Sequence, residues 1–160
     1  MQLTEIQKAW LAGFIDGEGY LGIIFQRKKE TKRQSASPRY HPYLVVVSTN
    51  RRILRHIMGL VPDGNVYLLK KESEKWKAAY QFKLTKMKPL LTLLKQLEPH
   101  LQLKKPQCRV LIEFLARRLL VKPVVGRGSR GITSFTDRDW GSHQELLTLN
   151  KRGPTHHVAA

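Results

Sequence analysis

Hydrophobic and polar positions change their period several times along the chain, and each change marks an expected element. At the start, apolar side chains recur at helical spacing: Ile6, Trp10, Leu11, Phe14 and Ile15. Thr4 and Gln7 form a capping-box pair at the beginning of this segment. Small residues occupy every fourth position of the same helix: Ala9, Gly13 and Gly17. Such a stripe lets a second helix approach closely.

The remaining elements follow from the same two periods. Alternation of apolar and polar residues predicts strands over residues 20–29, 40–48, 65–71 and 75–85. Helical spacing and capping signals, with Asn50 and Thr136 as N-cap candidates, predict helices over 51–60, 87–97, 106–120 and 135–150. Stretches rich in basic and polar residues predict loops over residues 27–39 and 122–134. The resulting order predicts an α+β fold, with one sheet and helices behind it. We expect residues 1–150 to form a single domain and residues 151–160 to form a basic, flexible tail.

Charge narrows the range of partners. The 160 residues contain 29 Lys and Arg against 12 Asp and Glu, a formal net charge of +17, with 41% hydrophobic residues. A folded domain this basic is expected to bind polyanions, first of all nucleic acid. Arg117 and Arg118 interrupt the longest apolar stretch, which argues against a membrane span. The lone Cys108 excludes a disulfide within the chain and a cysteine zinc site, and no signal peptide is evident, so we expect an intracellular protein.

Residues 11–19, which read LAGFIDGEG, carry the most specific signal. This segment resembles the signature motif of LAGLIDADG homing endonucleases, and six of its nine positions agree with the consensus. The resemblance implies the αββαββα fold of that family, here with additional C-terminal helices and a curved antiparallel sheet as the DNA-binding face. It also implies a site-specific nuclease of intron homing, which makes a staggered double-strand break in a long, nearly palindromic DNA site. Hosts of such proteins are organelles or microbes, and the sequence does not separate them.

A single copy of the motif has a consequence for assembly. The twin of the small-residue helix must come from a second chain, so we expect a homodimer with two-fold symmetry. The alternative is a lone helix whose glycines only permit close packing on its own sheet. The expected interface residues belong to the motif helix: Ala9, Ala12, Gly13, Asp16 and Gly17.

Glu18 is the expected metal ligand. In a symmetric dimer it would face the partner's copy of the same carboxylate, and such a pair repels unless a cation lies between the two groups. Mg²⁺ prefers oxygen ligands of this kind, and Mn²⁺ or Ca²⁺ could also bind. The resemblance adds the Gly17 carbonyl as a second ligand and gives Asp16 a structural role.

The resemblance also supplies two basic catalytic residues, Lys104 and Arg51, with Lys105 and Arg52 as the adjacent alternatives. The family often places a glutamine near the end of the second strand, where this sequence has Val47. One role in ordering solvent is therefore unfilled or belongs to another residue.

Alternation assigns a set of side chains to the expected DNA-binding face of the sheet, since a ribbon of strands fits the major groove. These residues are Tyr20, Gly22, Ile24, Gln26, Lys28, Tyr67, Leu69, Lys71, Lys75, Lys77, Gln81 and Lys83, and Arg39 and Tyr40 are added from the far end of the second strand. Arg127, Arg130, Lys151 and Arg152 are expected to hold the DNA backbone.

Other functions remain as alternatives. A non-cleaving member of the same fold would bind RNA as an intron maturase, or bind DNA as a regulator. A basic module at a membrane surface or on the ribosome would explain the charge but not the motif. We expect double-stranded DNA as the partner, with no small-molecule substrate and no membrane.

Overall fold

The computed structural model describes residues 2–27, 38–121 and 135–151. Its elements run in the order α1 (Glu5–Glu18), β1 (Gly19–Arg27), β2 (Pro38–Ser48), α2 (Arg51–Leu60), β3 (Asn65–Lys70), β4 (Ala79–Leu84), α3 (Met87–Leu97), the short 3-10 helix η1 (Glu98–His100), α4 (Lys105–Leu120) and α5 (Asp137–Leu149). This is the predicted α+β order. No helix in the described ranges is long and apolar enough to cross a membrane.

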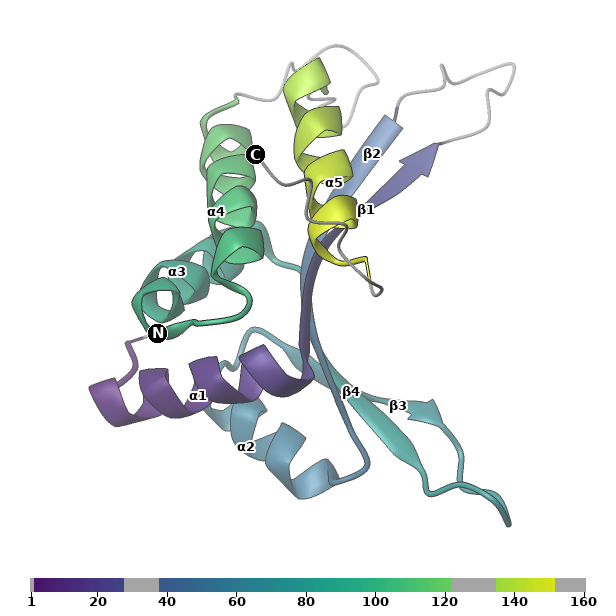
Figure 1. The fold of residues 1–160 in the computed structure, drawn as a ribbon. Helices are drawn as coiled ribbons and strands as arrows, with labels where there is room; N and C mark the ends of the chain where they lie inside the picture. Colours follow the sequence, from purple (N-terminus) through teal and green to yellow (C-terminus); the bar gives the residue numbers. More distant parts are fainter. Residues whose placement is uncertain (1, 28–37, 122–134, 152–160) are drawn as a thin grey trace, which may run out of the picture.

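The four strands form one antiparallel sheet in the order β1-β2-β4-β3. Helices α1 to α4 lie on one side of this twisted sheet (Figure 1). The β3–β4 hairpin projects away from the helices at one end, below and to the right in the view of Figure 1. The face of the sheet that points away from the helices is called the open face below.

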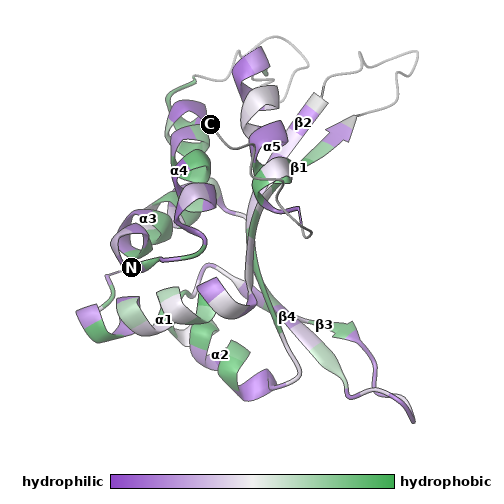
Figure 2. Ribbon diagram, viewed as in Figure 1, coloured by the Kyte–Doolittle hydropathy of each residue, from purple (hydrophilic) through white to green (hydrophobic). Residues whose placement is uncertain are grey.

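The core lies between the sheet and the helices. Its largest fully buried side chains include Phe82 on β4, Phe114 on α4 and Leu11 on α1. Each such side chain contributes roughly 1.5–3 kcal/mol when it leaves water. In Figure 2, α3 and α4 each carry both hydrophobic and hydrophilic residues, as amphipathic helices do.

Helix α1 is fixed at both ends by local chemistry. Thr4 and Gln7 form the predicted capping box, with the Thr4 hydroxyl accepting from the Gln7 backbone N–H at 3.3 Å. At the other end, a Cβ on Gly19 would lie 2.6 Å from the Ile15 carbonyl oxygen. Only glycine therefore allows the chain to turn directly from α1 into β1.

Helix α5 covers the outer edge of β1. The Asn150 amide donates to the Leu21 carbonyl at 2.9 Å, and the His143 Nδ1 lies 2.8 Å from the Ile23 carbonyl. Because β1 is at the edge of the sheet, these two contacts satisfy backbone groups that would otherwise be available to another strand.

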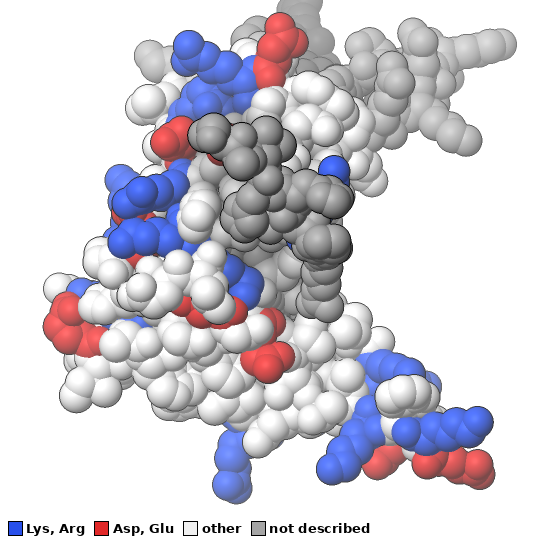
Figure 3. Space-filling model, in the orientation of Figure 1, with Lys and Arg blue, Asp and Glu red and all other residues white. Residues whose placement is uncertain are grey.

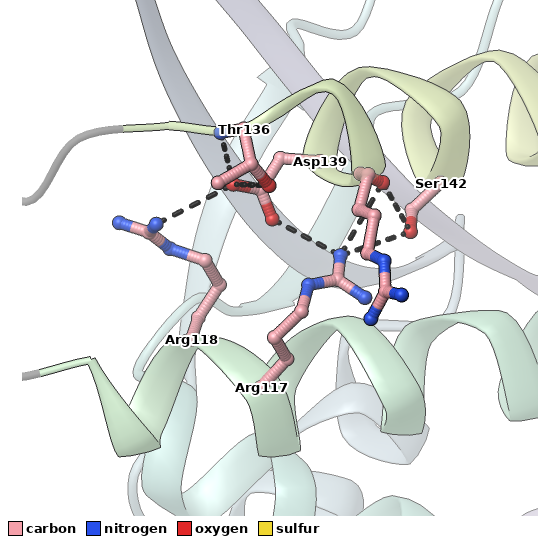
Figure 4. A network of polar contacts seen from close by, with 6 residues as sticks. Arg117, Arg118, Thr136, Asp139 and Ser142 are labelled. Carbon is pink, nitrogen blue, oxygen red and sulfur yellow. Dashed lines mark hydrogen bonds and ion pairs between the residues drawn. The ribbon is translucent and has the colours of Figure 1, made fainter.

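A buried ionic cluster attaches α5 to α4 (Figure 4). Asp139 is only 1% exposed, and its carboxylate lies 3.0 Å from Arg117 and 3.4 Å from Arg118. The same carboxylate accepts from the Thr136 backbone N–H at 2.9 Å, which completes a capping box at the start of α5. Thr136 was the predicted N-cap.

The fourth strand differs from the prediction. It begins at Ala79 rather than near residue 75, and Lys75 lies in a tight turn closed by Ser73 and Trp76. Lys77 lies between this turn and β4. Neither lysine therefore has the strand position that alternation assigned to it.

Several predictions fall outside the described residues. These are the DNA contact of Lys28, the backbone contacts of Arg127, Arg130 and Arg152, and most of the loops expected over residues 27–39 and 122–134. The tail expected over 151–160 is described only at Lys151.

Candidate active site and nucleic-acid interface

Glu18 lies at the last turn of α1, on the wall of an open hollow of about 520 Å³. Phe14 of α1, Val47 of β2, Asn50 before α2 and Ala79 of β4 also line this hollow. The Glu18 side chain is exposed, and within the described residues it makes no hydrogen bond or ion pair. Its carboxylate is therefore free to bind a ligand from outside the chain.

Asp16, two residues earlier, is used differently. It is 9% exposed, and its carboxylate accepts backbone hydrogen bonds from Gln102 at 2.7 Å and Lys104 at 2.8 Å. These bonds tie the end of α1 to the segment that leads into α4. Its position agrees with a structural role.

Lys104 is brought to the end of α1 by this same connection. Its ammonium donates to the backbone carbonyl of Asp16, two residues before Glu18. Lys105, the adjacent alternative, is the first residue of α4 and has no such bond among the described residues. The geometry therefore favours Lys104 over Lys105 as the basic neighbour of Glu18.

Arg51 is the first residue of α2, directly after Asn50, which lines the hollow. Its guanidinium carbon lies 5.4 Å from the centre of the Tyr80 ring, so a cation–π contact holds its side chain near β4. Asn50 caps α2 by accepting from the backbone N–H groups of Arg52 and Ile53. The Asn50 side chain is therefore used in this cap. Val47 contributes an apolar side chain to the lining of the hollow.

In the described part of the chain, no group of three His, Cys, Asp or Glu could hold a metal ion. One chain offers the Glu18 carboxylate, a hard oxygen donor of the type that Mg²⁺ accepts. The residues present thus fit half of a site, which a second copy of Glu18 would complete.

One face of α1 is uncovered. Ile6 is 83% exposed and Trp10 is 36% exposed, and the small residues Ala9, Gly13 and Gly17 of the same helix are also exposed. A Cβ on Gly13 or Gly17 would meet nothing within 4 Å. In the view of Figure 3, the surface around α1 and α2 is mostly uncharged, in contrast to the basic areas above and to the right.

Two expected interface residues are wrong. Ala12 is 0% exposed and belongs to the core, and Asp16 is held by the backbone groups described above. Both lie with Leu11 and Ile15 on the side of α1 that faces its own chain, and all four are buried. Ile6 and Trp10, which share the helical spacing of these residues, instead extend the uncovered face.

The open face of the sheet is defined by the strand register. One row across all four strands contains Tyr20, Val45, Lys83 and Asn65, and a second contains Val47, Gln81 and Tyr67. Gly22 lies opposite Tyr43, Ile24 opposite His41, and Gln26 opposite Arg39. The predicted residues Tyr20, Gly22, Ile24, Gln26, Arg39, Tyr67, Gln81 and Lys83 therefore share this face.

Tyr40 does not. Its side chain is 8% exposed and packs against Phe25, Phe114 and Phe135 on the helix side of the sheet. Because side chains alternate along a strand, the odd-numbered residues of β2 face outward. His41, Tyr43, Val45 and Val47 of β2 therefore also belong to this face, although the sequence pattern did not assign them to it, and fixing the register at Arg39 would have found them.

The outer part of β3 also differs from the prediction. The register shifts between Leu68 and Lys70, so Lys70 pairs with Ala79 and takes the outward place expected for Lys71. Leu69 lies within this irregularity and is 52% exposed, while Lys71 follows the end of the strand. The Lys70 ammonium lies 4.7 Å from the centre of the Trp76 ring at the hairpin turn.

Two raised pKa values show which groups keep their protons. Burial, helped by the neighbouring Tyr20, raises the pKa of Tyr43 to about 12. Burial among α3 and α4 raises the pKa of the Cys108 thiol to about 12. Cys108 is therefore a packing residue and not a nucleophile.

No protein-family model matches this sequence, and the search of curated proteins finds no match. Solved structures do match. The homing endonuclease I-CvuI in complex with DNA is 19% identical, with 94% of this chain and 87% of that one covered, at a TM-score of 0.64. The archaeal intron-encoded homing endonuclease I-Vdi141I, complexed with DNA, is 16% identical, with 96% and 89% covered, at a TM-score of 0.68.

The LAGLIDADG meganuclease I-AabMI, bound to uncleaved DNA, is 21% identical over 70% of this chain and 36% of that one, with a TM-score of 0.55. These similarities extend over nearly the whole chain in the first two cases. The chain therefore has the fold of the LAGLIDADG homing endonucleases.

Proposed function

We propose that this chain is a site-specific DNA endonuclease that acts as a homodimer and uses Mg²⁺ held by Glu18. The observation that carries this proposal is the uncovered face of α1, which ends at a free carboxylate. Among the described residues, the uncovered face of α1, the Glu18 carboxylate and the open face of the sheet each lack a partner. A second copy and a DNA duplex would supply all three.

The second copy packs its α1 against this one. Ala9, Gly13 and Gly17 allow the two helix backbones to approach, and Ile6 and Trp10 bury apolar surface at the periphery. In a two-fold arrangement the same patch serves both chains. The two Glu18 carboxylates then lie near the symmetry axis.

The two Glu18 carboxylates, with the Gly17 carbonyl as an added oxygen donor, would hold the metal ion. When bound, it supplies an activated water and neutralises charge at the phosphate. Lys104 stabilises negative charge that develops at the phosphate, and Arg51 binds the same phosphate group from the start of α2. The Asp16 bonds to Gln102 and Lys104 hold Lys104 at the required place.

The open face binds the duplex in its major groove. A ribbon of β-strands fits this groove, and residues of the open face can reach base edges. The structural neighbours I-CvuI and I-Vdi141I were solved with DNA, which supports the same use of the sheet here. A dimer carries twice the +17 charge of one chain, so we expect affinity to fall steeply with salt.

The test is cleavage of a palindromic duplex library with Mg²⁺. Each half-site is randomised at about ten positions, the length that a strand ribbon spans, which gives roughly a million sequences. The native chain should cleave a subset of this library at its centre. Glu18→Gln should reduce the cleavage rate by roughly 10³-fold while the affinity for the same sequences is kept.

Glu113→Gln is the matched control, since Glu113 is an exposed glutamate on α4 and the charge change is the same. It should cleave like the native chain. Binding of selected duplexes without cleavage by the native chain would favour a non-cleaving DNA-binding regulator. Selective binding of structured RNA in place of duplex DNA would favour the maturase alternative.

A further inference from the structure

Three side chains on the open face form one unit. The rings of Tyr20 and Tyr43 stack with centroids 5.7 Å apart and an interplanar angle of 19°. The Lys83 ammonium lies 5.6 Å from the centre of the Tyr43 ring, within cation–π range. Tyr20 and Lys83 share one row of the sheet, since Val45 pairs with both.

Gly22 makes this arrangement possible. It lies directly opposite Tyr43, beneath the two rings. A Cβ at this position would come within 2.7 Å of the Tyr20 ring and 3.1 Å of the Tyr43 ring. Both rings therefore pack over the backbone of Gly22, and any larger residue at this position would displace them.

The unit presents hydrogen-bond donors and no strong acceptor. Burial and the neighbouring Tyr20 raise the pKa of Tyr43 to about 12, so Tyr43 keeps its proton. Tyr20 is 37% exposed, so its hydroxyl and the Lys83 ammonium are two donors on the surface of the sheet.

The position of the unit favours contact with a base over contact with a phosphate. Lys83 is on β4, an interior strand of the sheet, while phosphates line the edges of a groove. The aromatic ring holds the ammonium close to the sheet. Beside it, Tyr43, Lys83, Ile24 and His41 line an open hollow of about 490 Å³, in which a base edge can sit.

We propose that Tyr20, Tyr43 and Lys83 together read a guanine in the major groove, once in each half of the DNA site. Guanine is the base that presents two neighbouring acceptors there, O6 and N7, and lysine is a common partner of this pair. Adenine places a donor next to N7, cytosine presents a donor, and thymine presents one acceptor and a methyl group. The inference rests on the proposed function, because it requires the open face to bind duplex DNA.

The test is sequence selection from the palindromic library by binding, with cleavage of the selected pool measured separately. The native chain should select guanine at one symmetric pair of positions, with a preference of roughly 5- to 150-fold over the other bases. Lys83→Met should abolish the preference at that pair and leave the other positions unchanged. Tyr43→Phe, which keeps the ring and removes the hydroxyl, should weaken the same preference.

Two further variants separate this outcome from general effects. Lys70→Met removes another lysine that lies over an aromatic ring, at the hairpin turn, and should leave the guanine preference intact. Gly22→Ala should reduce the preference at the same pair as Lys83→Met, because it displaces both rings.

Equal weakening of all sequences by Lys83→Met would make Lys83 a phosphate contact and overturn the inference. The inference would also be overturned if neither Lys83→Met nor Tyr43→Phe changed the preference for guanine at any position of the selected sites. The proposed function would remain intact in that case. Failure to select any duplex would overturn both.

Discussion

At the scale of single residues, the acids and bases around the end of α1 have distinct environments. Glu18 is exposed, whereas Asp16 is buried and bonded to two backbone N–H groups. The motif spacing alone puts both acids near the end of α1, and the sequence could therefore indicate where the candidate metal site lies. Which of them is free depends on the segment around residue 102, far away in the sequence, and only the resemblance suggested the correct division.

The sequence predicted less about which residues of α1 form its uncovered face. Ala12 and Gly13 are adjacent and both small, but one is 0% exposed and the other is uncovered. A helical period of 3.6 residues places neighbours about 100° apart, so the size of a residue does not reveal its face. Helical spacing could not show that Ile6 and Trp10 are exposed, because an apolar residue on an uncovered face has the same pattern as one that is buried in the core.

Cys108 provides a residue-scale test of the core. Burial raises the pKa of its thiol from 9.0 to about 12, so at pH 8 the thiolate fraction falls by roughly a thousandfold. We expect labelling by a thiol reagent at pH 8 to be at least that much slower in the folded chain than in urea. Labelling at similar rates in both states would show that α3 and α4 do not pack as described.

At the scale of elements, helices were predicted better than strands. Thr4, Asn50 and Thr136 each begin a helix where a capping residue was expected, since a cap is a local chemical signal. The start of β4 was wrong because alternation continues through the turn of residues 73–76, which has neither glycine nor asparagine to mark it. The bulge at Leu68 and Lys70 likewise depends on pairing with a distant strand.

The attachment of α5 to α4 gives a prediction at this scale. Asp139→Asn removes the charge that two arginines surround in a buried site, and we expect the free energy of unfolding to fall by about 3 kcal/mol. Urea denaturation measures this change. Asp137→Asn, in the exposed first turn of the same helix, should cost less than about 1 kcal/mol. Equal effects of the two changes would contradict the role of the Asp139 cluster.

At the scale of the whole molecule, the proposed metal site requires a second copy of the chain. Gly13→Arg introduces a long charged side chain on the uncovered face of α1, and we expect it to turn a dimer into a monomer in sedimentation equilibrium. Gly141→Arg is the matched control, because Gly141 is also an exposed helical glycine with nothing within 4 Å of an added Cβ. A native chain that remains monomeric both alone and on DNA would disprove the dimer.

A dimer would also complete the proposed active site. One chain contributes the Glu18 carboxylate, the basic residues Lys104 and Arg51, and the apolar side chain of Val47. The sequence could predict the sheet, the motif helix and the basic charge of the chain. It could not predict the register at Tyr43, which requires the pairing of β1 with β2.

The most direct measurement is the position of the cuts in DNA that the native chain cleaves with Mg²⁺. Sequencing both ends of the products from the palindromic library should show a cut in each strand, placed symmetrically about the centre of the selected site with a short stagger. Glu18→Gln should bind the same sites and leave them intact. Cuts unrelated to the two-fold centre, or equal cleavage by Glu18→Gln, would contradict a symmetric nuclease built around this carboxylate.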